Sequence, residues 1–396
     1  MTSPPAFRYF VGEVEVSASS GDPLWETPLP MDRHHFQDSD TSPPHYTGIT
    51  HGDYFSAARR FLEKDGFDII SSAFAPGLSG DAPNIHICLM KHGEFYHPAR
   101  ILVSSDGRQR TFVLNVAVSE SGRRIIDTEI SSLKRLGKIS KRSLIPRVYG
   151  QGCVAVRHDL DAEMFLGEWF EGYQEFHLSR NVSGKARKLC LWRENDTPYF
   201  LTSEDSGLLY HAVAKILTVY YNMATTEHIS RWHHASGDFV VKHEANRLSV
   251  KLVTVRAYGP LLQMEEEALN PRYNCDQATA ALLIFFLNLS IRMRLDRIDG
   301  IGDFVWADET AVTGAWTGFL DGLANNFFPS QWLSEPITQL KNYLATFSVS
   351  ELFDLAETLA ASLPALPAEK AIIEKHLGNH MAALCDTIST IGFPDI

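Results

Sequence analysis

The stretch RTFVLNVAVSESGRRIIDTEISSLKRL, at residues 110–136, decides the fold of this chain. Residues 110–119 are mostly apolar and rich in valine, which predicts a buried strand. Residues 122–136 repeat isoleucine and leucine at helical spacing, with Ile126 and Ile130 on one face. This spacing predicts an amphipathic helix, so a strand leads almost directly into a helix.

Two predicted strands precede this stretch and two follow it. The preceding strands are expected at residues 85–90 and 95–104, and an Asp-Gly turn at residues 106–107 connects the second of them to the third strand. The following strands are expected at residues 145–156 and 162–169. The predicted order is therefore three strands, one helix and two strands.

The chain is expected to divide into an N-terminal extension at residues 1–80, a β-rich lobe at residues 81–170 and a helical lobe at residues 171–396. The extension is rich in Pro, Ser, Asp and His, which break long elements. Within it the spacing predicts a helix from His51 to Lys64, a strand at residues 67–74 and a linker at residues 75–84.

The helical lobe is predicted to begin with short elements and to end in helices. We expect a hairpin at residues 188–202, a helix at residues 208–222 and two short strands at residues 239–242 and 249–256. Further helices are expected at residues 276–296, 309–324, 337–347, 350–362 and 368–388.

Composition limits the function. Of the 396 residues, 36 are Lys or Arg and 48 are Asp or Glu, so the formal net charge is −12. This balance argues against a nucleic-acid partner bound through a basic field. The five cysteines form no C-x-x-C pair, which indicates a reducing, cytoplasmic location. The longest apolar run, residues 280–291, is shorter than the roughly 20 residues of a membrane span, so we expect no membrane association.

Three stretches are arranged in a suggestive order. FVLNVAVS is followed by Glu129 in the predicted helix, and LGEWFEGY occupies residues 166–173. HISRWHHASGDFVVK, at residues 228–242, precedes a strand that ends in VKLVTVRAYGP. The arrangement resembles the protein-kinase-like superfamily, and within it the aminoglycoside and choline phosphotransferase branch. The resemblance implies an α+β, two-lobed protein-kinase-like fold.

The resemblance also implies which residues bind a nucleotide. Asn115 occupies the strand position where family members place a Lys, and Glu129 is in the position of that Lys's partner. Glu168 and Trp169 lie in the segment that resembles the adenine-binding hinge. Asn115 offers a hydrogen bond to phosphate but no positive charge. Only Gly93 stands in the first hairpin, so the glycine-rich phosphate cradle is missing.

Two alignments are possible for the segment that resembles the catalytic loop. In the first, Asp238 is the base and His243 replaces the metal-binding Asn. In the second, His233 replaces the base and Asp238 replaces that Asn. The run FVV after Asp238 favours the second. Thr254 then stands where a metal-binding Asp is expected, so the implied metal ligands are Asp238 and Thr254, with Arg256 nearby. Thr is a weak neutral ligand for Mg²⁺.

The polar residues of this region also have structural interpretations. His228, Arg231, His233, His234 and Asp238 form the densest polar cluster, and they either serve a site or tie down a loop around a buried Trp232. The HHxxxD pattern is a weak transition-metal signal.

Three other features of the sequence also have two interpretations each. Arg256 either binds an anion or pairs with Asp238, because a charge at the end of an apolar strand needs a partner. Glu129 either faces inward or is a solvated helix residue. Gly300 and Gly302 favour a helix cap and turn over a phosphate site, and the nearby Asp296, Asp299 and Asp303 are candidates for contact with a cationic partner.

We therefore predict a kinase-like protein with a degenerate active site, which acts as a ligand-binding or regulatory module. The first alternative is an active ATP-dependent phosphotransferase for a small molecule. In it Asp238 holds the metal, His233 is the base and Arg256 neutralises phosphate. The second alternative is another transfer reaction with the nucleotide reversed. The cofactors implied by an active site are ATP and Mg²⁺, and otherwise none. The expected partners are a nucleotide, another small molecule or a protein.

Overall fold

The computed structural model describes residues 4–30, 46–72, 83–93, 95–139, 144–158, 160–180, 187–192, 198–234, 237–244, 247–261, 271–300, 302–363 and 365–394. The chain forms two compact units. The first comprises residues 1–137 and 146–171, and the second comprises residues 138–145 and 172–396. The first is built around a sheet and the second is mainly helical, so the α+β class is confirmed.

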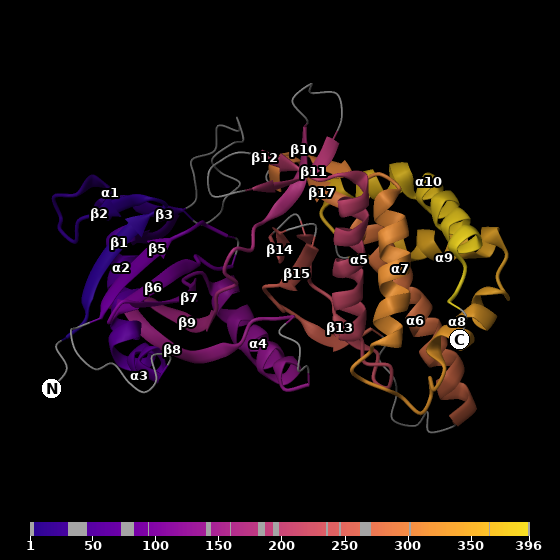
Figure 1. Cartoon of the computed structure of the whole chain (residues 1–396), viewed down its shortest axis with the longest axis horizontal. Helices are drawn as coiled ribbons and strands as arrows, with labels where there is room; N and C mark the ends of the chain where they lie inside the picture. Colours follow the sequence, from indigo (N-terminus) through magenta and orange to yellow (C-terminus); the bar gives the residue numbers. More distant parts are fainter. Residues whose placement is uncertain are drawn as a thin grey trace. The chain divides into compact units, whose positions relative to one another are not determined.

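The sheet of the first unit has seven strands in the order β2-β1-β5-β6-β7-β9-β8 (Figure 1). Its central elements follow the predicted order of three strands, one helix and two strands. Their bounds are β5 Asn84–Leu89, β6 Ala99–Ser105, β7 Arg108–Ala117, α4 Glu120–Gly137, β8 Val148–Arg157 and β9 Leu160–Glu168. Strand β9 lies between β7 and β8, which makes the five strands from β5 to β9 one antiparallel sheet.

The N-terminal segment adds two strands to this sheet. Strand β1 (Ala6–Val11) pairs in parallel with β5, and β2 (Val14–Val16) pairs antiparallel with β1. A short helix and a strand pair follow, with bounds α1 Pro23–Glu26, β3 Pro28–Pro30 and β4 Tyr46–Thr50. The described parts of the predicted extension therefore belong to the same compact unit as the sheet.

The predicted helix at residues 51–64 is confirmed. It consists of α2 (His51–Phe61), which begins at a capping box formed by Thr50 and Asp53, and the π-helical turn η2 (Leu62–Gly66). The strand expected at residues 67–74 is wrong, because the chain continues as α3 (Phe67–Ser72) with Ile70 buried on its inner side. Most of the expected linker at residues 75–84 lies outside the described residues.

The two faces of the seven-stranded sheet carry different side chains. Leu114 and Val116 of β7 belong to a large apolar core together with Tyr54 and Phe61 of α2. Asn115 points to the opposite face, because successive side chains of a strand alternate. Helix α4 packs against β7, β8 and β9.

The second unit contains short strand pairs and long helices. Its short elements are β10 Phe176–Arg180, β11 Arg187–Trp192, β12 Pro198–Phe200, β13 Glu227–Ile229, β14 Phe239–Glu244, β15 Arg247–Leu252, β16 Tyr258–Pro260, β17 Leu295–Arg297, the 3-10 turn η4 Ile298–Gly300 and β18 Phe304–Trp306. Its helices are α5 Ser203–Val219, α6 Pro271–Met293, α7 Thr310–Ala324, α8 Pro336–Leu344, α9 Val349–Ser362 and α10 Pro367–Ile391. The predicted helices are thus all present.

The glycines near residue 300 form a turn. Helix α6 ends at Met293, and Gly300 and Gly302 belong to the connection between the antiparallel strands β17 and β18. The turn interpretation is confirmed, whereas the helix-cap interpretation is wrong. The hypothesis that Asp296 contacts a cationic binding partner outside this chain is also wrong, because Asp296 is fully buried. Among the described residues, no helix has both the length and the apolar composition to cross a bilayer.

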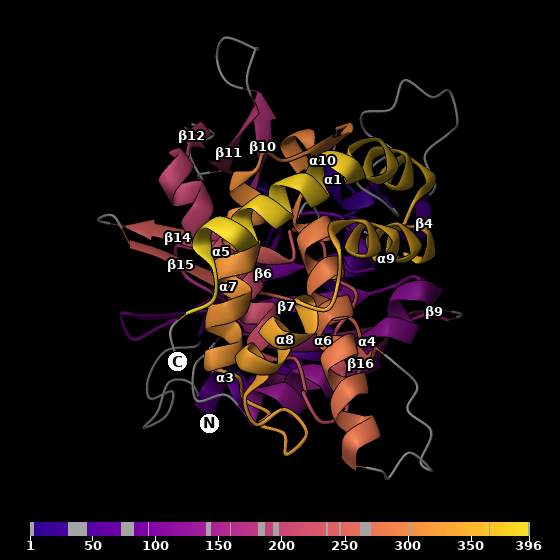
Figure 2. The same ribbon diagram turned by 90° about the vertical axis from the view of Figure 1, so that its right-hand side faces the viewer.

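Helices α5 and α7 pack against each other and lie side by side in Figure 1, and α7 lies in front of α5 in Figure 2. Gly314, Gly318 and Gly322 recur every four residues along α7 and face α5. A Cβ atom at Gly318 would overlap the carbonyl oxygen of His211, and one at Gly322 would lie 2.5 Å from Cβ of Thr218. The glycine stripe therefore permits the close approach of the two helices.

We expect Gly318→Ala to destabilise the protein by about 1–3 kcal/mol, the range typical of an overpacked core. The loss should exceed the gain of up to about 1 kcal/mol that alanine gives in a helix. The matched control is Gly378→Ala on α10, where the nearest atom to a new Cβ lies at 4.0 Å. In urea denaturation, Gly378→Ala should leave the free energy of unfolding unchanged or raise it. Equal stability of the two variants would contradict the packing argument.

Candidate functional site

The candidate site of the second unit is built on the loop between β13 and β14. This loop contains His233 and His234 and ends at Gly237, whose φ of 71° suits a glycine. The Gly237 amide donates to the His234 carbonyl at 3.0 Å, which closes the turn just before Asp238. The loop thus delivers Asp238 at the start of β14.

Asp238 is buried, with 1% of its surface exposed, and its carboxylate is fully engaged. The backbone amide of His233 donates to Oδ2 at 2.8 Å. Arg256 donates through Nη1 to Oδ2 at 2.9 Å and through Nη2 to Oδ1 at 2.6 Å. This two-point ion pair confirms one of the two interpretations of Arg256 and is the strong, geometrically specific form of the interaction.

The other residue of the implied metal set, Thr254, follows a residue whose backbone is hydrogen-bonded to Asp238. The amide of Val253 donates to the Asp238 carbonyl at 2.8 Å, which places the buried Thr254 beside the ion pair. Within the described ranges, no group of three or more His, Cys, Asp or Glu side chains is arranged to hold a metal ion. Arg256 instead supplies the positive charge that faces the Asp238 carboxylate.

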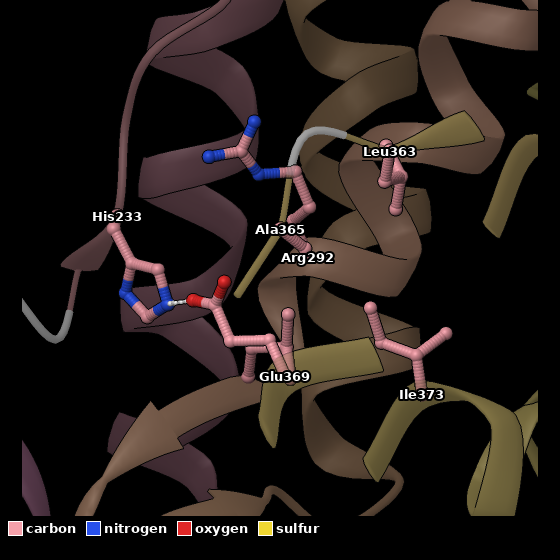
Figure 3. A pocket seen from close by; sticks show the side chains of 7 residues that line it. His233, Arg292, Leu363, Ala365, Glu369 and Ile373 are labelled. Carbon is pink, nitrogen blue, oxygen red and sulfur yellow. Dashed lines mark ion pairs between the residues drawn. The ribbon is translucent and has the colours of Figure 1, made fainter. Parts of the chain in front are cut away.

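His233 contacts a residue that the sequence analysis did not single out. Its Nε2 lies 3.3 Å from Oε1 of Glu369, near the start of α10 (Figure 3). Oε2 of Glu369 accepts the Leu366 amide at 2.7 Å. Burial alone raises the pKa of Glu369, but the His233 ring and the Leu366 amide outweigh it and hold that pKa below its ordinary value. Glu369 is therefore ionised beside His233 at neutral pH.

A small pocket adjoins this pair and is lined by His233, Arg292, Leu295, Leu363, Ala365, Glu369 and Ile373 (Figure 3). Its volume is about 20 Å³, which is enough for about one water molecule. Arg292 closes one side and donates to the carbonyls of Ser230 and Trp232, with its guanidinium 5.0 Å from the Trp232 ring. The pocket accommodates a water molecule but not a nucleotide.

The other predicted residues belong to the first unit. Asn115 is half-buried on β7, opposite Phe165 of β9. Glu129 is 1% exposed on α4, which confirms that it faces inward. Glu168 ends β9, and its carboxylate accepts the Arg147 amide at 3.2 Å. Trp169 follows directly and is half-buried. Of these residues, only Glu129 is fully buried, whereas Asn115, Glu168 and Trp169 are half-buried.

The segment around Glu168 that resembles a hinge ends at a glycine whose backbone conformation suits that residue type. Gly172 has a φ of 74°, a left-handed conformation that favours glycine over other residues.

The structure thus groups His233, Asp238, Thr254 and Arg256 in one unit, and Asn115, Glu129, Glu168 and Trp169 in the other. The pairing of His233 with Glu369 was missed because the two residues are far apart in the sequence and share no spacing pattern. Trp232 is buried against Phe239, as its packing interpretation predicts.

The similarity of this chain to known proteins is slight. No protein-family model matches the chain, and no curated protein matches it. Among solved structures, the chain is similar to WaaP in complex with acyl carrier protein, with 13% sequence identity. The match covers 76% of this chain and 95% of the other, with a TM-score of 0.29.

Proposed function

We propose that this chain is a kinase-like protein with a degenerate active site, which acts as a ligand-binding or regulatory module. The observation that carries the proposal is the two-point pairing of Asp238 with Arg256 at 2.6 and 2.9 Å. A carboxylate that faces a guanidinium has no net charge left for Mg²⁺. Phosphoryl transfer depends on metal ions and cations that neutralise the phosphates, so this arrangement opposes it.

Two replacements in the sequence, one in each unit, support the same proposal. Asn115 stands where the kinase resemblance implies a Lys, and an amide brings no positive charge to a phosphate. Thr254 stands where that resemblance implies a metal-binding carboxylate. Each of these replacements removes a charge, and together with Arg256 they weaken the electrostatics on which the reaction relies.

We also propose a cytoplasmic location and a nucleotide, another small molecule or a protein as the partner. The five cysteines are all free, which suits a reducing compartment. The acidic net charge of −12 speaks against a nucleic-acid partner.

A second candidate function is an ATP-dependent phosphotransferase with Mg²⁺ as its metal, and one observation favours it. His233 Nε2 faces the ionised Glu369 at 3.3 Å, and a histidine oriented by a carboxylate is the usual form of a general base. In this candidate Asp238 and Thr254 hold the metal, which requires Arg256 to leave Asp238. His233 then accepts the proton of the substrate hydroxyl.

We expect millimolar ATP to give no Mg²⁺-dependent increase in melting temperature and no turnover. A ligand at 100 times its Kd stabilises a protein by about 2.7 kcal/mol, which thermal shift detects readily. If ATP raises the melting temperature equally with Mg²⁺, Mn²⁺ or EDTA, the chain is a nucleotide-binding module without metal chemistry. If ATP leaves the melting temperature unchanged, a protein partner is favoured. A metal-dependent shift with turnover, both lost in Asp238→Ala, would contradict the proposal and favour the phosphotransferase.

A further inference from the structure

A buried carboxylate lies between two imidazoles in the second unit. Asp296 of β17 is fully buried. Its Oδ1 lies 3.7 Å from Nδ1 of His177 on β10, and its Oδ2 lies 3.8 Å from Nδ1 of His234 in the candidate-site loop. Both histidines are at least 96% buried. We call these three residues the Asp296 cluster.

The backbone fixes the position of the Asp296 carboxylate. The amide of Leu178 donates to Oδ2 and the amide of Arg297 donates to Oδ1, each at 2.7 Å. Two amide hydrogen bonds orient a carboxylate but do not neutralise it, and a buried charge without a counter-ion is strongly destabilising. The cluster therefore requires a positive charge.

His234 is poorly placed to carry that charge. Its Nε2 lies 3.1 Å from the carbonyl oxygen of Met293. A carbonyl only accepts, so Nε2 bears the hydrogen and the neutral ring presents an unprotonated Nδ1. This tautomer satisfies the Met293 carbonyl without a charge and turns the lone pair of Nδ1 toward Asp296, the one carboxylate among the described residues that this ring faces. The ring is further enclosed by the aromatic rings of Phe176 and Tyr210.

His177 is placed to carry the charge, because a carboxylate faces each of its ring nitrogens. Nδ1 faces Asp296 at 3.7 Å and Nε2 faces Oε2 of Glu175 at 3.7 Å. Only the imidazolium has a hydrogen on both nitrogens. The ring also packs on the backbone of Gly300, where a Cβ atom would lie 2.6 Å from Nε2. Gly300 has a φ of 75°, so the turn leaves just enough room for this ring.

Other ionisable groups are carried by the elements packed against β10. These are Arg187, Lys188 and Cys190 on β11, Asp299 in η4, Asp296 and Arg297 on β17, Lys242, His243 and Glu244 on β14, and His234 in the loop, besides Glu175. In the described part of the chain, the carboxylates within 4 Å of the His177 nitrogens belong to Asp296 and Glu175. The local charges therefore favour a proton on His177.

We propose that His177 is a buried imidazolium whose ion pair with Asp296 locks β10 to β17, and that loss of its proton releases this lock. The proton leaves to solvent by way of Glu175, which is 27% exposed. The deprotonated cluster keeps a buried carboxylate without a counter-ion, which weakens the contact between β10 and β17.

The direction of the pKa shifts agrees with this assignment. Burial lowers the pKa of His177, but Asp296 and Glu175 outweigh burial and raise it above 6.5. Burial lowers the pKa of His234 to about 4. A raised pKa in the folded protein stabilises fully below pH 6.5, and this stabilisation is lost as the pH rises through the folded pKa. The lock therefore opens on the alkaline side of pH 6.5.

Histidine NMR on the intact, 15N-labelled protein tests the assignment directly. We expect one buried histidine at pH 6.5 with the nitrogen shifts of an imidazolium, and its signal should be absent in His177→Gln. A neutral His177 at pH 6.5 would overturn the proposal. Since this measurement needs no ligand, its outcome is independent of whether the chain binds a nucleotide.

Stability and hydrogen exchange test the release. From pH 6.5 upward, the unfolding constant of the wild type should rise by as much as tenfold per pH unit, the slope of one proton. Amide exchange of β10 (residues 176–180) and β17 (residues 295–297) should increase over the same range beyond its ordinary base catalysis. Both effects should vanish in His177→Gln and persist in the exposed control His158→Gln. Identical pH profiles of the wild type and His177→Gln would overturn the proposal, even if the variant is less stable throughout.

Discussion

Acidification from pH 7 to pH 4 is expected to unfold the protein. Burial lowers the pKa of His228 and of His234 to about 4, and that of His97 and of His380 to about 3. In the unfolded chain these histidines titrate near 6.5. Below that pH the unfolded state binds more protons than the folded state, so stability falls as the pH falls.

The expected loss is large compared with the stability of a typical protein. A shift from 6.5 to about 4 corresponds to roughly 3 kcal/mol for each histidine, whereas native proteins have about 5–15 kcal/mol in total. Three of these four histidines, His228, His234 and His380, belong to the second unit. The second unit should therefore unfold at a higher pH than the first.

Urea denaturation at pH 7, 6 and 5, followed by tryptophan fluorescence and far-UV circular dichroism, measures this loss. The midpoint should fall steeply, and His228→Gln should reduce the pH dependence by about one proton, whereas the exposed control His158→Gln should not. A midpoint that is unchanged between pH 7 and pH 5 would show that these histidines are not buried in neutral form.

The second large effect is expected for Arg256→Ala. This change removes the cation that faces the buried Asp238 and leaves an uncompensated carboxylate. Breaking a buried ion pair from one side typically costs about 3–5 kcal/mol. The matched control is Arg231→Ala, an exposed arginine of the same loop, which should change the free energy of unfolding by less than about 0.5 kcal/mol.

A second variant separates the buried charge from simple loss of packing. If the buried charge is the cause, Arg256→Ala combined with Asp238→Asn should be more stable than Arg256→Ala alone, because the amide carries no charge. Chemical denaturation of the two single variants and the double variant gives the coupling energy. Additive effects would mean that the pair contributes nothing as a pair, and the assignment of Arg256 as the counter-ion of Asp238 would be wrong.

Much of the fold follows from the periodicity of the sequence. The strands around β7 and the long helices were predicted because their apolar residues recur over many positions. The three-residue strands β13, β16, β17 and β18 were missed because so short a segment has no measurable period. The role of β1 was missed for another reason. It pairs with β5, which lies far along the chain, and such pairing leaves no local pattern.

The site could be predicted only in part. The pairing of Arg256 with Asp238 was one of two interpretations, because a charge at a strand end needs a partner but spacing does not identify it. Glu369 and Asp296 were not assigned to the site. Their partners His233 and His177 come from distant segments, and only the packing of α10 and β17 brings them together. In the sequence, Asp296 was instead grouped with Asp299 and Asp303 as a candidate for contact with a cationic partner.

The central claim is that Arg256, rather than a metal ion, balances the charge of Asp238. Calorimetric titration of Mn²⁺ into the protein with saturating ATP tests it most directly, after subtraction of the binding of Mn²⁺ to ATP alone. The account predicts no protein-dependent binding, and the same result for Asp238→Ala. Stoichiometric Mn²⁺ binding that disappears in Asp238→Ala would contradict it.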